Sequence, residues 1–173
     1  MRIREAVPED VESLEKLQLA AFGEEGAVVA GLVRELMHDE SATPRLALVA
    51  VSEKEIIGSV IFSSVEIIGV KELMGFILAP LAVAPKNQRS GIGTDLIRYG
   101  LAALRDIGAE VVFVYGNPAY YSKFGFNNNH QVLAPFQITH PEGWLILQLR
   151  DDPLDVISGK LVCANSLNRR DHW

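Results

Sequence analysis

The chain has 173 residues, of which 49% are hydrophobic and 22% are charged, and this is typical of one ordinary soluble domain. The formal net charge of -6 disfavours a general nucleic-acid-binding surface. No apolar stretch reaches the ~18 residues that a membrane span requires, and the start lacks the apolar core of a signal peptide. We therefore expect a cytoplasmic protein that binds neither nucleic acid nor membrane.

The metal-binding residue types are sparse. The single cysteine, Cys163, excludes an internal disulfide framework and a multi-cysteine metal site. We interpret it as a buried small hydrophobe, because no nearby histidine pattern would activate it as a nucleophile. The histidines His38, His130, His140 and His172 show no paired ligand spacing, which favours surface or turn positions. The sequence therefore predicts no metal cofactor.

The first half of the chain predicts a strand, two helices and three more strands. Residues 2–6 predict a short strand, and apolar residues then recur at helical spacing over residues 11–21 and 28–37. The aliphatic stretches "RLALVAV" and "IIGSVIFSSVEII" flank the polar "SEKE", which predicts an antiparallel hairpin. The run "GFILAPLAVAP" has no polar face and predicts a central strand.

The second half predicts a βαβ unit followed by a hairpin. A wide apolar stripe begins at residue 92 and predicts a helix that ends near Gly108, before the buried strand "EVVFVYG". The strands on either side of this helix should run parallel, with a right-handed crossover. "NPAYYSKFGF" predicts one or two helical turns, and "FQITH" and "GWLILQLR" predict a closing hairpin around "PEG". The pattern from residue 151 onward is too mixed to assign.

The turn "PKNQRSGIGTDL", residues 85–96, carries the clearest chemical signal. Gly91 and Gly93 lie where a strand gives way to a helix, so backbone N–H groups can converge on a ligand at the positive helix end. That geometry suits a phosphate. A nucleotide-binding module is disfavoured, because the lysine of a Walker loop and the third glycine of a Rossmann fingerprint are both missing.

A different family fits this turn. "LAVAPKNQRSGIG" resembles the acyl-CoA-binding motif Q/R-x-x-G-x-G/A of the GNAT superfamily of N-acetyltransferases, with Gln88, Gly91 and Gly93 filling the pattern. "NPAYYSKFGF" is similar to the fourth-helix signature of the family, Y-x-x-x-G-F, with Tyr121 as its tyrosine. The segments "APLAVAP" and "GNPAYY" are most similar in sequence to a bacterial branch of the family whose acceptors are largely unassigned. The resemblance covers residues 2–149, most of the chain.

The resemblance implies the GNAT fold, of the α/β (α+β) class. This fold has a central mixed, mostly antiparallel sheet with a splayed parallel strand pair, flanked by helices. We expect a single domain over residues 1–173, with a core of residues 2–149 and a C-terminal extension of residues 150–173. Pro80 cannot donate a ladder hydrogen bond, which predicts a bulge in the central strand. In GNAT proteins such a bulge splays the parallel strands.

The resemblance also implies acetyl-CoA as cosubstrate. In the family, amides around residues 88–94 bind the CoA pyrophosphate, and backbone groups of the splayed strand bind pantetheine. The implied cofactor-binding residues are Leu81, Ala82, Val83, Gln88, Arg89, Ser90, Gly91, Ile92, Gly93, Thr94 and Asn117. Arg89 and its neighbour Lys86 would add positive charge, unless they are only solvated loop cations.

Tyr121 matches the family tyrosine that protonates the departing thiolate. With an ordinary pKa of about 10, a tyrosine keeps its proton at neutral pH and can donate it to a sulfur of comparable basicity. The alternative is an aromatic packing residue beside Phe124 and Phe126, and adjacent Tyr120 is expected to be such a partner. The resemblance therefore assigns Tyr121 the role of general acid.

The general base is left open by the sequence. Many relatives carry a carboxylate just before the Leu-Ala-Val of the central strand, where this chain has Ala79 and Pro80. Glu66, Glu24 and Glu25 are candidates, and a water molecule or the acceptor's own protonation equilibrium could serve instead. If Glu24 and Glu25 line the site, they favour a cationic amine acceptor.

The hypothesis from sequence is an N-acetyltransferase that transfers an acetyl group from acetyl-CoA to a primary amine of a small molecule or protein. The alternative is a catalytically silent acyl-CoA-binding domain that senses the cofactor or regulates a partner. A homodimer is left open.

Overall fold

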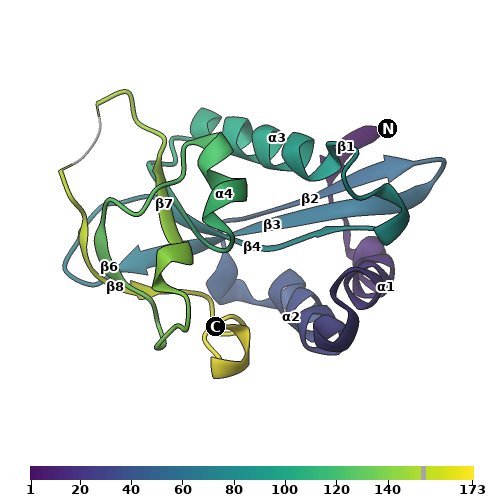
Figure 1. Ribbon diagram of the computed structural model, residues 1–173, viewed down its shortest axis with the longest axis horizontal. Coiled ribbons are helices and arrows are strands. Elements are labelled where there is room, and N and C mark those ends of the chain that lie inside the picture. The colour runs from purple at the N-terminus through teal and green to yellow at the C-terminus, as the bar shows by residue number, and fades with distance from the viewer. Residues whose placement is uncertain (153–154) are drawn as a thin grey trace.

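The computed structural model describes residues 1–152 and 155–173, and a mixed sheet forms its middle layer (Figure 1). The strands are β1 (Arg2–Glu5), β2 (Arg45–Ser52), β3 (Glu55–Ile67), β4 (Gly75–Val83), β5 (Val111–Tyr115), β6 (Gln131–Leu133), β7 (Trp144–Gln148) and β8 (Ser158–Val162). The helices are α1 (Val11–Phe22), α2 (Gly26–His38), α3 (Ile92–Asp106) and α4 (Pro118–Tyr121). Within this described part, no helix combines the length and apolar character of a membrane span.

The strand order of the sheet is β1-β2-β3-β4-β5-β7. Along this path all neighbours are antiparallel except β4 and β5, which are parallel and joined through α3. The predicted hairpin of β2 and β3 and the predicted βαβ unit are both confirmed. β8 adds an antiparallel partner at the far end of β3 and pairs in parallel with β6.

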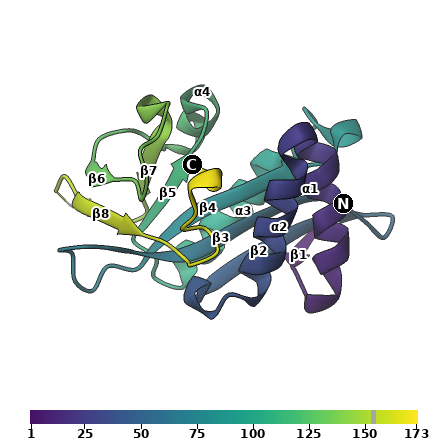
Figure 2. The ribbon, with the colours of Figure 1, turned by 90° about the horizontal axis from the view of Figure 1, so that it is seen from below.

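The helices lie on opposite faces of the sheet, with α1 and α2 on one face and α3 on the other (Figures 1 and 2). Because successive side chains of a strand point to opposite faces, neighbouring residues of β3 pack into two separate cores. Ile61 packs with Val33 and Leu36 of α2, whereas Phe62 packs with Leu96 and Leu104 of α3. The two cores hold the sheet rigid between them, and β4 runs through its middle.

The predicted closing hairpin is wrong. Residues 136–140 form no strand, and Pro141–Gly143 is a 3₁₀ turn. Pro135 and Pro141 border this segment, and neither can donate a ladder hydrogen bond that would extend a strand beyond it. β7 instead pairs with β5, so its apolar side chains complete the central sheet. The tail contributes β8, while residues 153–154 of the predicted extension lie outside the described residues.

The bulge predicted at Pro80 is confirmed. Val60 of β3 faces Leu81 and Phe62 faces Leu78, so Ile61 alone opposes both Ala79 and Pro80. Beyond this point β4 is no longer paired with β5, because the parallel ladder covers only Gly75–Ile77 of β4 in the described structure. The two strands therefore part in the middle of the sheet.

Close packing of α3 on the sheet gives a test of the fold. A Cβ atom on Gly100 would lie 2.2 Å from Cε2 of Phe62, a fully buried ring that cannot move aside without disturbing the core. We expect Gly100→Ala to lower the free energy of unfolding by about 1–3 kcal/mol, measured by urea denaturation. Gly31→Ala on α2 is the control. Its Cβ meets nothing closer than an Arg34 nitrogen at 3.9 Å, so the substitution should stabilise by about 0.5–1 kcal/mol. Equal effects of the two substitutions would contradict this packing.

Candidate active site

The gap beside β4 exposes a specific set of backbone groups. The N–H of Ala84 donates to the carbonyl of Ile57, which makes this an antiparallel hydrogen-bonded pair. Hydrogen-bonded pairs alternate along such a ladder, so Ala82 also faces β3, while the N–H and C=O of Leu81 and Val83 point the other way. The amide side chain of Gln88 confirms this direction, because its Nε2 donates to the Val83 carbonyl over 3.2 Å. Leu81 and Val83 thus present backbone groups to the gap.

A cavity of about 280 Å³ lies where the gap meets the turn before α3, and we name it the glycine-turn cavity. Its walls are Leu81, Val83, Asn87, Gln88, Arg89, Gly91, Ile92, Gly93, Thr94 and Tyr120. Eight of the eleven predicted cofactor residues are therefore gathered around one space. Ala82 is buried toward β3, the Ser90 hydroxyl donates to the Asn87 carbonyl, and Asn117 lies elsewhere.

The geometry of this turn leaves several donors available. Gly91 is the N-cap of α3 and has a φ of +90°, a left-handed conformation that disfavours a side chain. The first intrahelical hydrogen bond of α3 runs from the N–H of Asp95 to the Gly91 carbonyl. The N–H groups of the preceding first-turn residues have no intrahelical acceptor, and the helix dipole adds positive charge there. With Arg89 in the wall, the cavity has the donor set of a phosphate site.

Two residues of this cavity were not predicted as cofactor ligands. Tyr120, expected only to pack, hydrogen-bonds through its side chain to Thr94 and so joins α4 to α3. Asn87 has a buried Oδ1 with no hydrogen-bond partner in the described part of the chain. Tyr120 belongs to the same "NPAYY" motif as Tyr121, so this motif could have indicated that Tyr120 lies at the site. The role of Asn87 had no sequence signal beyond its place in the loop.

Asn117 performs a local structural function. Its Oδ1 accepts a hydrogen bond of 2.9 Å from the N–H of Ala119 and so caps α4. The residue lines a separate pocket with Gly116, His140 and Glu142. Its assignment to the cofactor stays a prediction.

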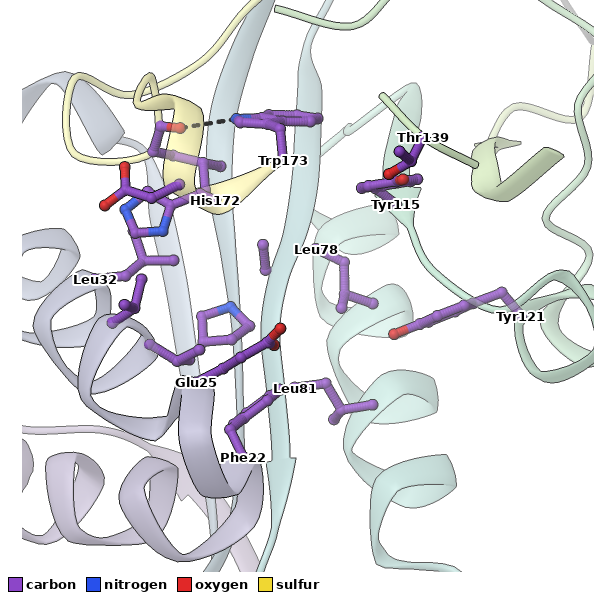
Figure 3. Close-up of a pocket in the computed structure, with 16 residues that line it drawn as sticks. Phe22, Glu25, Leu32, Leu78, Leu81, Tyr115, Tyr121, Thr139, His172 and Trp173 are labelled. Carbon is purple, nitrogen blue, oxygen red and sulfur yellow. Dashed lines mark hydrogen bonds between the residues drawn. The ribbon is translucent and has the colours of Figure 1, made fainter. Parts of the chain in front are cut away.

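A second cavity, of about 470 Å³, meets the first at the gap beside β4, and we name it the Tyr121 cavity (Figure 3). Its walls come from the α1–α2 junction, the bulged part of β4, the end of β5, α4 and the C-terminal turn. The lining residues are Phe22, Glu25, Val28, Val29, Leu32, Leu78, Ala79, Pro80, Leu81, Tyr115, Tyr121, Thr139, Leu167, Asp171, His172 and Trp173. Leu81 lines both cavities, so they are neighbours at the gap.

The surroundings of Tyr121 bear on both roles that the sequence left open. Its ring packs edge-on against Tyr120 and Phe126, at centroid distances of 5.1 and 5.8 Å. Its hydroxyl points into the cavity (Figure 3) and has no hydrogen-bond partner among residues 1–152 and 155–173. Burial, with a smaller contribution from Tyr120, raises the pKa of Tyr121 well above its usual value of 10. The side chain therefore holds its proton in place.

The structure separates the three candidate carboxylates. Glu25 lines the Tyr121 cavity, and Figure 3 shows its carboxylate directed toward the tyrosine hydroxyl from the opposite wall. Glu24 is exposed and does not line the cavity. Glu66 is exposed near the far end of β3, beside β8 and away from the bulge. Glu25 is thus the candidate that is positioned to meet a ligand.

The C-terminal turn supplies a wall that sequence reasoning missed, because nothing in the mixed tail pattern pointed to a site. Asp39 anchors it by accepting hydrogen bonds from the backbone N–H and the hydroxyl of Ser166, over 2.8 and 2.6 Å. Arg169 adds an ion pair of 3.2 Å with Glu35 of α2. Figure 2 shows the turn on the same face of the sheet as α2. These contacts fix Trp173 at the cavity.

His172 lies in this turn and is half-buried. Desolvation is the main cause that lowers its pKa below the usual 6.5, so the ring is mainly neutral at pH 7. Cys163 is buried, as predicted, and burial raises the pKa of its thiol to about 11. In the described part of the chain, no three His, Cys, Asp or Glu residues are grouped so that they could hold a metal ion.

Comparison with known proteins identifies the family. Residues 43–128 match the model of the acetyltransferase (GNAT) domain. The N-acetyltransferase YjhQ of Escherichia coli K12 is 35% identical over 162 residues, covering 90% of this chain and 88% of YjhQ. The chain belongs to the GNAT family of acetyltransferases. GNAT enzymes use acetyl-CoA as cosubstrate, so the predicted superfamily and enzyme class are confirmed.

Solved GNAT structures confirm the predicted fold. The crystal structure of Escherichia coli YhbS in complex with CoA superposes with a TM-score of 0.87 at 31% identity, over 98% of this chain and 92% of that protein. A GNAT acetyltransferase of Brucella melitensis in complex with acetyl-CoA gives a TM-score of 0.76 at 28% identity, over 96% and 97%. YhbS and YjhQ are bacterial, in agreement with the predicted branch. The expected location and homodimer stay predictions.

The two cations of the glycine turn offer a matched pair of variants. Arg89 lines the glycine-turn cavity, whereas Lys86 lies outside it and pairs with Glu55 over 3.0 Å. We expect Arg89→Ala to weaken acetyl-CoA binding about tenfold, because the substitution removes one charge-assisted hydrogen bond. Lys86→Ala should change it less than about twofold. Calorimetric titration measures both, and equal losses would contradict a phosphate contact of Arg89.

The Asp39 anchor predicts a pH dependence of stability. Burial opposes ionisation of Asp39, but hydrogen bonds from Ser166 and Ser41 outweigh it and lower its pKa from 3.8 to about 2. This lowered pKa contributes stability that is complete above about pH 4 and is lost as the pH falls toward 2. Between pH 2 and 6, the free energy of unfolding should change with pH by roughly 1–2 kcal/mol less in Asp39→Asn than in the unsubstituted protein, as measured by urea denaturation. Glu40→Gln, at an exposed carboxylate, is the control. If Asp39→Asn leaves the pH dependence of stability unchanged, the anchoring role of Asp39 is refuted.

Proposed function

We propose that this GNAT enzyme acetylates a primary amine that binds in the Tyr121 cavity, with Tyr121 as the general acid. The observation that carries the proposal is the junction of the two cavities at Leu81. One cavity has the donor set of a phosphate site, and its neighbour has a free hydroxyl donor facing a carboxylate. A cosubstrate with a phosphate at one end and a reactive group at the other matches this pair.

The glycine-turn residues fit the phosphate end of acetyl-CoA. First-turn amides of α3 and the Arg89 side chain would hold the pyrophosphate. The outward N–H and C=O groups of Leu81 and Val83 would hold the pantetheine arm, as an added strand would. Complexes of YhbS with CoA and of the Brucella melitensis enzyme with acetyl-CoA support this assignment.

Residues of the Tyr121 cavity would then orient the reaction. Bound acetyl-CoA supplies the thioester whose acetyl group moves to nitrogen as the carbon–sulfur bond breaks. The amine, already neutral when it attacks, loses one proton to solvent as the carbon–nitrogen bond forms. Tyr121 gives one proton to the departing sulfur and regains one from solvent. Its raised pKa keeps the hydroxyl protonated at neutral pH.

Glu25 has a separate role in this proposal. An acceptor amine reaches the enzyme mainly as an ammonium ion, and the carboxylate that lines the cavity attracts that form. Glu25 is exposed, so solvent can still remove the ammonium proton before attack. We therefore assign Glu25 to acceptor binding and leave proton removal to water.

Tyr121→Phe tests the mechanism because it removes the hydroxyl and keeps the packed ring. We expect kcat to fall by a factor of about 10²–10⁴, the usual contribution of general acid catalysis, while the Kd of acetyl-CoA stays within about twofold. Thiol release and calorimetry measure the two quantities. Tyr99→Phe, at a half-exposed ring on α3 outside both cavities, should alter neither. An unchanged kcat in Tyr121→Phe would remove the hydroxyl from the mechanism.

A further inference from the structure

We propose that the acceptor is a compact monoamine with an apolar, ring-bearing body, and that Glu25 and Trp173 select it. This inference rests on the proposed function and narrows it. It separates arylalkylamines from polyamines and aminoglycosides, which carry several ammonium groups.

The charge of the Tyr121 cavity fits one ammonium group. Its described lining contains no lysine or arginine, and its side-chain carboxylates are those of Glu25 and Asp171. Asp171 already has a cation, because Nη2 of Arg169 lies 3.5 Å from its Oδ2. Glu25 has no ion-pair partner in the described part of the chain. One uncompensated carboxylate therefore faces the ligand, and further ammonium groups would be left without counter-charge.

Apolar side chains form a large part of the remaining wall, which also includes the polar groups of Thr139 and His172. Leu32 and Leu167 are buried, and Val29 and Phe22 continue the surface toward Glu25. A charged or strongly hydrated substituent placed against these side chains would lose water without gaining a partner. An apolar body would instead be stabilised in proportion to the area that it buries. The wall thus penalises a polycation and favours a hydrophobic amine.

The aromatic part of the wall is held in a fixed orientation. The ring of Trp173 stacks on Tyr115 with an interplanar angle of 14° and meets Trp144 edge-on at 5.5 Å. Its Nε1 donates to the Leu167 carbonyl over 3.0 Å, and Trp144 stacks in turn on buried Phe113. The indole needs no reordering to receive a ligand. It offers a flat surface to a substrate ring, at little entropic cost.

The volume of the Tyr121 cavity limits the size of the acceptor and also favours a compact amine. Its volume of about 470 Å³ must hold the thioester end of the cosubstrate as well as the acceptor. Sites for whole drug-sized ligands span about 300–1,000 Å³, so little room is left for a molecule of several sugar rings. A single ring on a short aminoalkyl chain is the body that these walls fit.

A panel of amines tests the substrate class directly. The full chain with saturating acetyl-CoA would be assayed for thiol release with tryptamine, phenethylamine, spermidine and kanamycin. We expect kcat/KM for the two arylalkylamines to exceed that of both polycations at least tenfold. Higher kcat/KM for spermidine or kanamycin would overturn this inference and leave the proposed function standing. Acetyl-CoA binding with no release from any amine would overturn both.

Variants then test the two selecting side chains. Glu25→Gln should raise the KM for tryptamine at least tenfold with kcat changed less than threefold, while Glu24→Gln leaves both within twofold. Trp173→Ala should raise the same KM at least fivefold, and Trp173→Phe should restore most of the loss. The Kd of acetyl-CoA, measured on each variant, reports that the fold and the cosubstrate site are intact. A tryptamine KM unchanged in Glu25→Gln and in Trp173→Ala would refute the assignment.

Discussion

The parting of β4 from β5 is the constraint on which the site depends. A central strand normally satisfies its backbone groups on both sides, yet here the parallel ladder ends at Ile77 and the bulge at Ala79 and Pro80 turns the strand away. The gap leaves the N–H and C=O groups of Leu81 and Val83 for water or a ligand. Two packed cores, one on each face, hold the sheet together around this interruption. The cost of unpaired backbone is thus confined to the place where a ligand can offset it.

Because both cavities open at the gap beside β4, distant parts of the chain meet there. The N-terminus of α3 supplies charge and amide donors in the glycine-turn cavity, and α4 joins it there through Tyr120 and Thr94. In the Tyr121 cavity, the α1–α2 junction and the C-terminal turn form the wall opposite Tyr121. Asp39 and Ser166 couple the turn to α2, so the Tyr121 cavity is built by residues more than a hundred positions apart.

Sequence reasoning succeeded where local chemistry determines structure. Gly91, Gly93 and Tyr121 could be placed from their motifs, because the special backbone and the aromatic signature are local signals. Prediction failed where long-range pairing decides. The apolar run ending at Leu149 was predicted to form a hairpin with residues 136–140, but β7 pairs with β5 instead, and a partner so distant in the chain leaves no local signal. Trp173 reaches the cavity through contacts with Tyr115, Trp144 and Leu167, which a reading along the chain cannot foresee.

In the mechanism that we propose, opposing electrostatic demands act on an acceptor amine in the Tyr121 cavity. A carboxylate near the ammonium strengthens binding but raises the pKa of the amine, which disfavours the neutral nucleophile; apolar walls lower that pKa by desolvation. Glu25 is exposed, so solvent screens its charge and it raises the pKa of the bound amine only a little. Tyr121 is embedded among rings, where its own ionisation is suppressed. The cavity therefore places the group that attracts charge near water and the group that must keep its proton away from water, an arrangement that allows both binding and attack.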